Sequence, residues 1–474
     1  MIKSETLIKY IIIIILFLFI ITPTFSQNSD SLRYPKLKLE LPLFDLPYQL
    51  DASKTYNNGK LSFKSFFQGY ANPSMHLSLD LTADLYSASH YEIYKLFHRE
   101  NNLNMSGGKR FLYTLSLIGT DFILNYAPLG DGWEHEEYHR AIMTRFHVNS
   151  FNEMNTFPIG AEAVSVDHVT DEDLIRFKLE SPTDFNRMHV AGIEGKYLLI
   201  DRLERNNFYY KQKLPNELYY LFTTLNAISY VVYCSIPSIN DRYTDEFNIV
   251  EESIEQRDFT GFDFTGWTYD IFRPNENYAL RGMHTSGVGI NRYIKTTDLK
   301  PEELTYLKNQ GKLQLLNMLS PMLFGIKEIK LTNDLYGNFS VHHFLTSFGN
   351  DIVLNVLLKN SYYNTFFAFH NYQNYTSYFP AIEGQLVDYN IHFQKINLYC
   401  SPRIIVGFQP KEQQFKSDNM SLLGLAECKF ELRTKSNINP FIEFSEKTKG
   451  WIAGNEFLTS NFSCRLGISA RFYK

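Results

Sequence analysis

Two histidines on one predicted helix are the residues best able to do chemistry in this chain. They belong to the run His135-Glu136-Glu137-Tyr138-His139, which has the H-E-x-x-H spacing. Residues four apart lie on one face of an α-helix, so both imidazoles can reach a single metal ion. Glu136 lies between them, close enough to hold a water at that ion and take its proton. The spacing therefore predicts a metal site with Glu136 as its base.

The residues around the motif predict that it is helical. Pro128 and Gly130 end the preceding element, and Asp131 and Glu134 form a pair typical of a capping box. The stripe that carries the two histidines continues with three apolar residues, Ile142, Met143 and Phe146. The histidines should thus face the interior, where an unsatisfied imidazole is costly. A metal would satisfy them, and so would buried hydrogen bonds.

The motif resembles that of the zincin metallopeptidases. The resemblance implies a Zn²⁺ ion held by His135, His139 and a third residue, with Glu136 as the general base. In the gluzincin branch of this group the third ligand is a Glu on a later helix, and Glu194 resembles that arrangement. The resemblance implies a hydrolase that acts on a peptide or protein.

The surroundings of Glu194 leave its role open. It lies in a helix predicted from 184 to 205, with apolar residues at helical spacing, and a buried carboxylate needs a cation or a metal. Pairing with an Arg or Lys is therefore the alternative to metal binding. Glu162, 23 residues after His139, is a rival third ligand in a segment predicted to be extended. Three small residues near Glu194 should let another helix approach closely: Ala191, Gly192 and Gly195.

Residues 1–26 have the pattern of a signal peptide. Lys3 and Lys9 precede the apolar run Tyr10–Ile21, and Thr24-Phe25-Ser26 is typical of a cleavage site. We expect cleavage after Ser26 and export from the cytoplasm. The net charge of −5 argues against a nucleic-acid partner.

Residues 27–330 are predicted to form a mainly helical, metallopeptidase-like domain. Residues 28–56 are expected to be a loop, and 75–81 alternate apolar and polar residues as a strand does. A helix is expected over 110–126. The uncharged run 218–236 is long enough to span a membrane, but its polar residues favour a buried core helix.

Residues 331–474 alternate with a period of two, which predicts antiparallel strands. Apolar residues occupy the even positions of 462–472, and polar residues and glycine occupy the odd ones. We expect about eight strands, several of them long enough, when tilted, to cross a hydrocarbon core of about 30 Å. Cys400, Cys428 and Cys464 share the apolar phase, as small hydrophobic residues would.

The aromatic end of the chain, Phe472-Tyr473, resembles the closing strand of Gram-negative outer-membrane barrels. This resemblance implies contact with outer-membrane lipid and a location at the cell outer membrane, facing either the periplasm or the surface. A soluble antiparallel sandwich is the alternative, because one solvated face gives the same alternation. The expected fold class is α+β, a helical zincin-like domain followed by a β-barrel-like region.

Two functions follow from these patterns. The first is a membrane-associated zinc metallopeptidase that hydrolyses peptide bonds with a metal-activated water. The second is a non-enzymatic outer-membrane β-barrel, either a channel or a structural protein, with an incidental or structural metal site. The metal content of the protein and the role of Glu136 distinguish these two functions.

Overall fold

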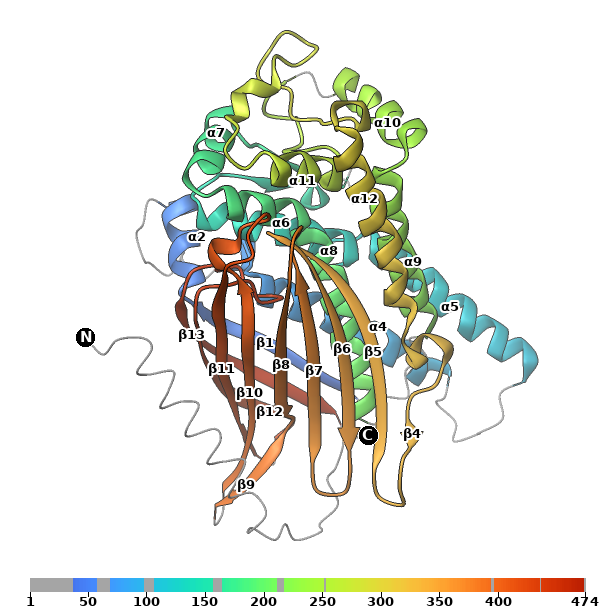
Figure 1. The fold of residues 1–474 in the computed structure, drawn as a ribbon. Helices are drawn as coiled ribbons and strands as arrows, with labels where there is room; N and C mark the ends of the chain where they lie inside the picture. Colours follow the sequence, from blue (N-terminus) through green and yellow to red (C-terminus); the bar gives the residue numbers. More distant parts are fainter. Residues whose placement is uncertain are drawn as a thin grey trace.

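The computed structural model describes residues 37–57, 69–97, 106–156, 164–210, 217–250, 253–393, 396–434 and 436–472. The predicted signal segment 1–26 lies outside these ranges. Helices and one large sheet make up the molecule (Figure 1). The mixed α and β composition expected from the sequence is therefore confirmed.

The helices cover one face of the sheet and extend beyond its upper end in Figure 1. They are α2 (Tyr48–Asn57), α4 (Met75–Phe97), α5 (Gly107–Asn125), α6 (Asp131–Arg145), α7 (Asp171–Glu180), α8 (Pro182–Tyr209), α9 (Glu217–Cys234), α10 (Pro237–Val250), α11 (Asp263–Phe272) and α12 (Pro301–Leu313). Two short 3₁₀ helices, η5 (Gln314–Met318) and η6 (Pro321–Phe324), follow α12. None of the helices in the described ranges is long and apolar enough to cross a membrane.

The large sheet is antiparallel throughout. Its strands are β1 (Leu37–Leu46), β4 (Ile329–Lys330), β5 (Tyr336–Thr346), β6 (Gly349–Lys359), β7 (Asn364–Gln373), β8 (Tyr378–Leu386), β9 (Tyr389–Phe393), β10 (Ile396–Pro410), β11 (Met420–Arg433), β12 (Ile438–Lys447) and β13 (Asn461–Phe472). Their order is β1-β13-β12-β11-β10-β8-β7-β6-β5-β4, and β9 pairs with β10. A separate pair, β2 (Phe151–Asn152) and β3 (Val166–Asp167), lies among the helices.

The sheet is large but not closed. Its edges are β1 and β4, and these do not pair with each other within the described part of the chain. The prediction of antiparallel strands over 331–474 is confirmed, whereas closure into a barrel is not found. Strand β1 also comes from the region predicted to be helical, so the sheet crosses the expected boundary at residue 330.

The core lies between α8 and the inner face of the sheet. Helix α8 begins at Pro182, a residue well suited to the first helical turn. Tyr197 packs against Phe344 on β5, with ring centroids 5.9 Å apart. Phe344 in turn contacts Trp451, which follows β12. This packing fixes α8 behind the sheet, and α8 positions the functional site.

Two sequence predictions in the N-terminal part are wrong. Residues 75–81 begin α4 rather than a strand, because α4 buries side chains on several faces and its apolar residues need not follow a single stripe. Residues 28–56 contain β1 and α2 rather than only a loop. In β1, Pro42 lies at an irregularity in the pairing with β13, where a proline is tolerated. The helices expected over 110–126 and 218–236 are confirmed as α5 and α9. The prediction that 218–236 is a buried core helix is wrong in part, because Phe222, Leu225 and Tyr233 of α9 are exposed.

Candidate metal centre

Helix α6 carries the H-E-x-x-H motif in the interior of the protein. The helix is confirmed, but its cap is Gly130, which makes no side-chain hydrogen bond, so the predicted capping box is wrong. Asp131 instead forms an ion pair with Lys196 on α8, with Nζ and Oδ2 3.4 Å apart. All residues of α6 before Arg145 are buried. The two histidines therefore face protein, as the sequence predicted.

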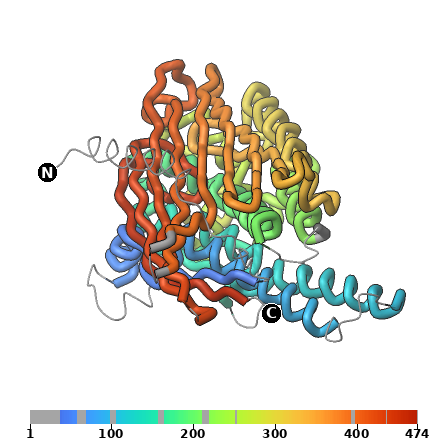
Figure 2. The backbone as a smooth tube through the Cα atoms, turned by 90° about the horizontal axis from the view of Figure 1, so that it is seen from below, coloured from blue at the N-terminus to red at the C-terminus, as the bar shows by residue number. Residues whose placement is uncertain are grey.

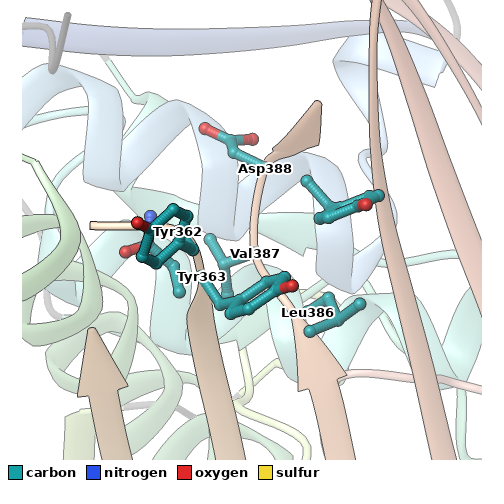
Figure 3. A pocket seen from close by; sticks show the side chains of 7 residues that line it. Tyr362, Tyr363, Leu386, Val387 and Asp388 are labelled. Carbon is teal, nitrogen blue, oxygen red and sulfur yellow. The ribbon is translucent and has the colours of Figure 1, made fainter. Parts of the chain in front are cut away.

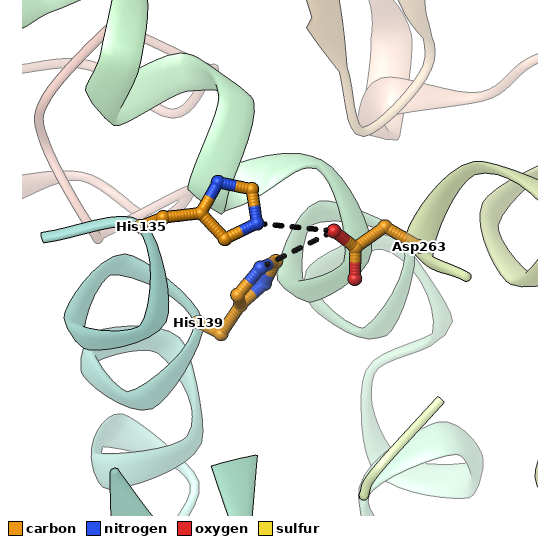
Figure 4. Close-up of side chains that lie close together, drawn as sticks. All are labelled: His135, His139 and Asp263. Carbon is orange, nitrogen blue, oxygen red and sulfur yellow. Dashed lines mark hydrogen bonds and ion pairs between the residues drawn. The ribbon is translucent and has the colours of Figure 1, made fainter. Parts of the chain in front are cut away.

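The two histidines meet the carboxylate of Asp263, the first residue of α11 (Figure 4). His135 Nε2 lies 3.2 Å from Asp263 Oδ2, and His139 Nε2 lies 3.6 Å from the same oxygen. One ligand atom from each of the three residues lies within 4.8 Å of the other two. Two imidazoles and a carboxylate are a ligand set that Zn²⁺ uses in proteins.

These distances fit a single ion between the three side chains. Ligand atoms about 2.0–2.1 Å from a tetrahedral Zn²⁺ lie about 3.3 Å from each other. The separations of 3.2 and 3.6 Å agree with this value. In addition, His139 Nε2 is buried and has no hydrogen-bond partner among the described residues. The residues present therefore fit the metal that the motif implies.

A backbone contact orients His139. Its Nδ1 lies 2.5 Å from the carbonyl oxygen of Met188 on α8, so this nitrogen donates a hydrogen bond. In the neutral imidazole, the form that binds a metal, the other ring nitrogen, Nε2, carries the lone pair and faces Asp263. Hydrogen bonds of this kind fix the tautomer and the ring orientation of metal-binding histidines.

Glycines on α8 allow this close approach to α6. A Cβ at Gly192 would lie 2.4 Å from Nε2 of His135, and one at Gly195 would lie 3.0 Å from the ring of Tyr138. Only a residue without a side chain leaves the His135 ring where it is. The prediction that these small residues accommodate another helix is confirmed, and that helix is α6.

Glu194, the predicted third ligand, does not belong to this group of side chains. Its Oε1 accepts hydrogen bonds from Arg187 Nη2 at 2.9 Å and from the backbone nitrogen of Gly454 at 2.7 Å. Its Oε2 accepts one from Trp451 Nε1 at 3.2 Å. The carboxylate thus ties α8 to the segment between β12 and β13. The alternative of a buried Glu paired with an Arg describes it correctly, and Asp263 takes its place at the centre. The rival residue, Glu162, lies outside the described residues.

Sequence reasoning missed Asp263 because no local pattern marks it. It stands 124 residues after His139 in Gly261-Phe262-Asp263, and an Asp in the first turn of a helix is ordinary. A second missed residue is Tyr230 on α9, whose hydroxyl donates to Asp263 Oδ2 at 2.9 Å. The ring of Tyr230 also contacts that of His135 edge to face. These residues come together because α9 and α11 pack against α8, which also packs against α6.

The pKa values of His135, His139 and Asp263 reflect burial together with mutual attraction. Burial alone would raise the pKa of Asp263, but the charge of His139 and the hydrogen bond from His135 hold it below its usual range. Burial would lower the pKa of His139, yet the Asp263 carboxylate brings it to about 9. For His135 burial dominates, and its pKa falls to about 4. Binding of Zn²⁺ would displace a proton from His139.

Glu136 is the other titratable group of the centre. It is buried, and burial raises the pKa of its carboxyl well above the usual range, opposed by the charge of His139. The Asp263 carboxylate raises this pKa further. Glu137, by contrast, accepts two hydrogen bonds from Arg140 and has a structural role on the other side of α6. Glu136 thus lies within electrostatic reach of His139 and Asp263, and its predicted role as a base stays a prediction.

The small pocket at the far end of the sheet offers no comparable chemistry. It lies between the β6–β7 turn and the β8–β9 turn, and Figure 3 shows Tyr362, Tyr363, Leu386, Val387 and Asp388 around it. Its volume of about 10 Å³ would hold roughly one water molecule. The centre on α6 is therefore the better candidate.

Comparisons with family models, with curated proteins and with solved structures found no match to this chain. The assignment of the site therefore rests on its residues and their geometry.

Proposed function

We propose that this protein is a zinc-dependent metallopeptidase that hydrolyses peptide bonds in a peptide or protein. The observation that carries the proposal is the meeting of His135, His139 and Asp263 beside Glu136. A chance motif would not be expected to find a third ligand from a helix more than 100 residues away in the sequence.

His135, His139 and Asp263 would hold the ion. Three protein ligands leave a fourth position free, as in catalytic zinc sites. When bound, Zn²⁺ would lower the pKa of a water molecule and polarise the carbonyl of the scissile bond.

Glu136 would act as general base and then as general acid. A carboxylate whose pKa is raised by burial accepts a proton more readily at neutral pH. Glu136 would take the proton of the attacking water and then transfer it to the nitrogen of the leaving amine. Because Glu136 is not a ligand, this role is separable from metal binding.

Two further residues would position the ligands. The Met188 carbonyl holds the imidazole of His139 through Nδ1, and the Tyr230 hydroxyl holds the carboxylate of Asp263. Both contacts are made by buried or half-buried groups, where hydrogen bonds restrict motion strongly. They would keep the ligands in place before a substrate arrives.

The second candidate is a non-enzymatic membrane protein with a structural metal site. Deep burial favours it, because Asp263 is 3% exposed and His139 is fully buried. Structural zinc sites, however, usually have four protein ligands, and this centre offers three among the described residues.

Zinc content and peptide hydrolysis, measured on the same preparations, test the proposal. Wild-type protein should hold about one zinc per chain and cleave a mixed peptide library. Glu136→Gln should keep the zinc and lose cleavage. If Glu136→Gln cleaves as well as wild type, the peptidase mechanism is wrong. If wild type holds zinc and cleaves nothing, the structural site is the better account.

A further inference from the structure

The large sheet presents apolar residues on its outer face. On β10 to β13 the even-numbered residues share this face, because each pairs with an even-numbered neighbour. On β10 they are Leu398, Cys400, Pro402, Ile404, Val406 and Phe408. Of the described even-numbered residues on these four strands, one is charged, Glu446 at the end of β12. On β13 the odd-numbered residues from 463 to 471 are buried, whereas the even-numbered ones are exposed or half-buried.

Charged residues lie on the inner face of the same strands. They form close pairs: Arg403 with Glu383, Arg471 with Glu431, and Arg465 with Glu443. Several of them line a cavity of about 190 Å³ between the sheet, α4 and α8. The polarity of β10 to β13 is therefore the reverse of that expected for soluble strands with one solvated face.

The exposed side chains of the outer face are large. Ile382 on β8 is 61% exposed, Leu422 on β11 is 60% exposed, and Phe369 on β7 is 53% exposed. They belong to different strands across the sheet, so the exposure is not confined to one edge. Contiguous apolar surface of this extent marks contact with a membrane or a partner.

Helix α5 continues the apolar surface beyond the sheet. Its exposed residues include Phe111, Leu112, Leu115, Phe122 and Ile123. The one charged residue between Phe111 and Asn125 is Asp121, which is buried against His90. Lys109 and Arg110 stand at the start of the helix. Such an arrangement suits a helix whose first turn meets charged headgroups while the rest meets acyl chains.

Helix α9 and the 3₁₀ helices add to the same surface. Phe222 and Leu225 on α9 are exposed, as are Leu319 after η5 and Phe324 in η6. Helix α9 packs against α5, η5 and η6, while η6 packs against β5 and α4 packs against β1. The helices therefore fill the space between the two open edges of the sheet. We call the outer face of the sheet together with the exposed faces of α5 and α9 the apolar mantle.

We propose that the apolar mantle contacts the acyl chains of a lipid bilayer. In this arrangement helices α5 and α9 supply the apolar surface between the two open edges of the sheet. Strands β10 and β11 have 15 and 14 residues. At ~3.3 Å per residue and a tilt of about 40°, such strands reach about 35 Å along the bilayer normal, enough for a hydrocarbon core of about 30 Å.

A second copy of the chain fits the apolar mantle less well than a lipid bilayer does. The mantle follows the curved sheet and continues onto helices on another side of the molecule (Figure 2). One protein partner typically covers about 800 Å² on one side. A bilayer surrounds a protein and so can cover every side at once.

Tryptophan quenching by brominated lipid tests this proposal directly. The three native tryptophans are buried and provide a constant background. We would introduce Phe369→Trp on the sheet, Phe122→Trp on α5 and Leu225→Trp on α9. The matched control is Leu280→Trp, an exposed apolar position in the yellow-green segment at the top of Figure 1. Each protein is transferred from detergent into phosphatidylcholine vesicles, with and without bromine on the acyl chains.

The added emission of the three mantle variants should fall at least twofold in brominated vesicles, whereas that of the control should not change. If Phe369→Trp is not quenched, or if the protein stays out of the vesicles as a soluble dimer or monomer, the proposal is wrong. Quenching on the sheet without quenching at Phe122→Trp and Leu225→Trp would overturn the part assigned to the helices.

Discussion

The metal centre and the inner face of the sheet both bury charged groups, but they satisfy them differently. On the sheet, carboxylates such as Glu431 and Glu383 are matched by guanidinium groups at 2.7 and 2.8 Å. At the centre, Asp263 Oδ2 accepts hydrogen bonds from Tyr230 and His135, and no Arg or Lys pairs with Asp263 among the described residues. His139 Nε2 lies 3.6 Å from the same oxygen and has no hydrogen-bond partner in the described part of the chain.

This difference separates a structural role from a functional one. A permanent cation satisfies a carboxylate by itself, so such a pair needs no ligand. Ligand atoms that converge without a permanent cation are satisfied fully only when an ion joins them. By this criterion Glu194, which is paired with Arg187, belongs with the sheet pairs rather than with the centre.

The largest expected effect comes from breaking a pair on the sheet. Glu431→Met leaves the buried guanidinium of Arg471 without its bidentate partner and should lower the free energy of unfolding by about 3–5 kcal/mol. Urea unfolding in detergent would measure it. The double variant Glu431→Met with Arg471→Met should recover most of the loss. If the single change costs nothing, the pairs do not carry the structural role assigned to them.

Loss of the base at the metal centre should reduce activity without reducing stability to the same extent. Glu136→Gln should slow peptide cleavage by about 10²–10⁴-fold, because the attacking water loses its proton acceptor. Steady-state kinetics on the peptide that wild type cleaves fastest gives the ratio of the wild-type rate to the Glu136→Gln rate. Glu180→Gln, at the end of α7, is an exposed control that should leave cleavage unchanged. Equal rates for Glu136→Gln and wild type would contradict the assignment.

Crowding the interface between α6 and α8 should weaken the metal site. A methyl group at Gly192 would displace the ring of His135, so Gly192→Ala should lower zinc affinity by about 10–100-fold, as loss of support for a ligand does. Competition with a chromogenic chelator measures the affinity. The control is Gly119→Ala on α5, where a methyl group meets open space. Unchanged zinc affinity in Gly192→Ala would show that α8 does not hold His135 in place.

The smallest effect concerns pH and the sheet. Burial would lower the pKa of His370, but Asp351 and Glu383 raise it to about 9. The pKa of His370 in the folded protein lies above its unfolded value of about 6.5. This histidine therefore stabilises the fold fully below about pH 6.5, and its contribution is lost as the pH rises to about 9. The loss should be on the order of 2 kcal/mol. Urea unfolding at pH 6 and pH 9 gives the change in the free energy of unfolding between the two pH values, which should be smaller for His370→Asn than for wild type. An equal change in both proteins would contradict the stabilising role of His370.

Local patterns predicted local structure well. The motif lies on a helix as predicted, α8 begins two residues before its predicted start at 184, and the alternation in 462–472 lies within β13. In each case a pattern within about 15 residues determines the element. The positions of the two histidines on one face of α6 were predictable for the same reason.

Contacts between distant parts of the chain could not be predicted in this way. Asp263 reaches the centre only because α11 packs against α8, and β1 joins the sheet only through pairing with β13. Glu194 had the burial expected of a ligand, but its partner Arg187 decides its role. A carboxylate's burial follows from local periodicity, whereas the identity of its partner follows from the whole fold.

Zinc stoichiometry in two carboxylate variants tests the central claim most directly. The account predicts about one zinc per chain in wild type and in Glu194→Gln, and little or no zinc in Asp263→Ala. With its amide oxygen in the place of Oε1, Glu194→Gln can keep the hydrogen bonds from Arg187 and Gly454, so the fold should persist. Near-ultraviolet circular dichroism would confirm that each variant is folded. Zinc retained by folded Asp263→Ala and lost from folded Glu194→Gln would contradict the account.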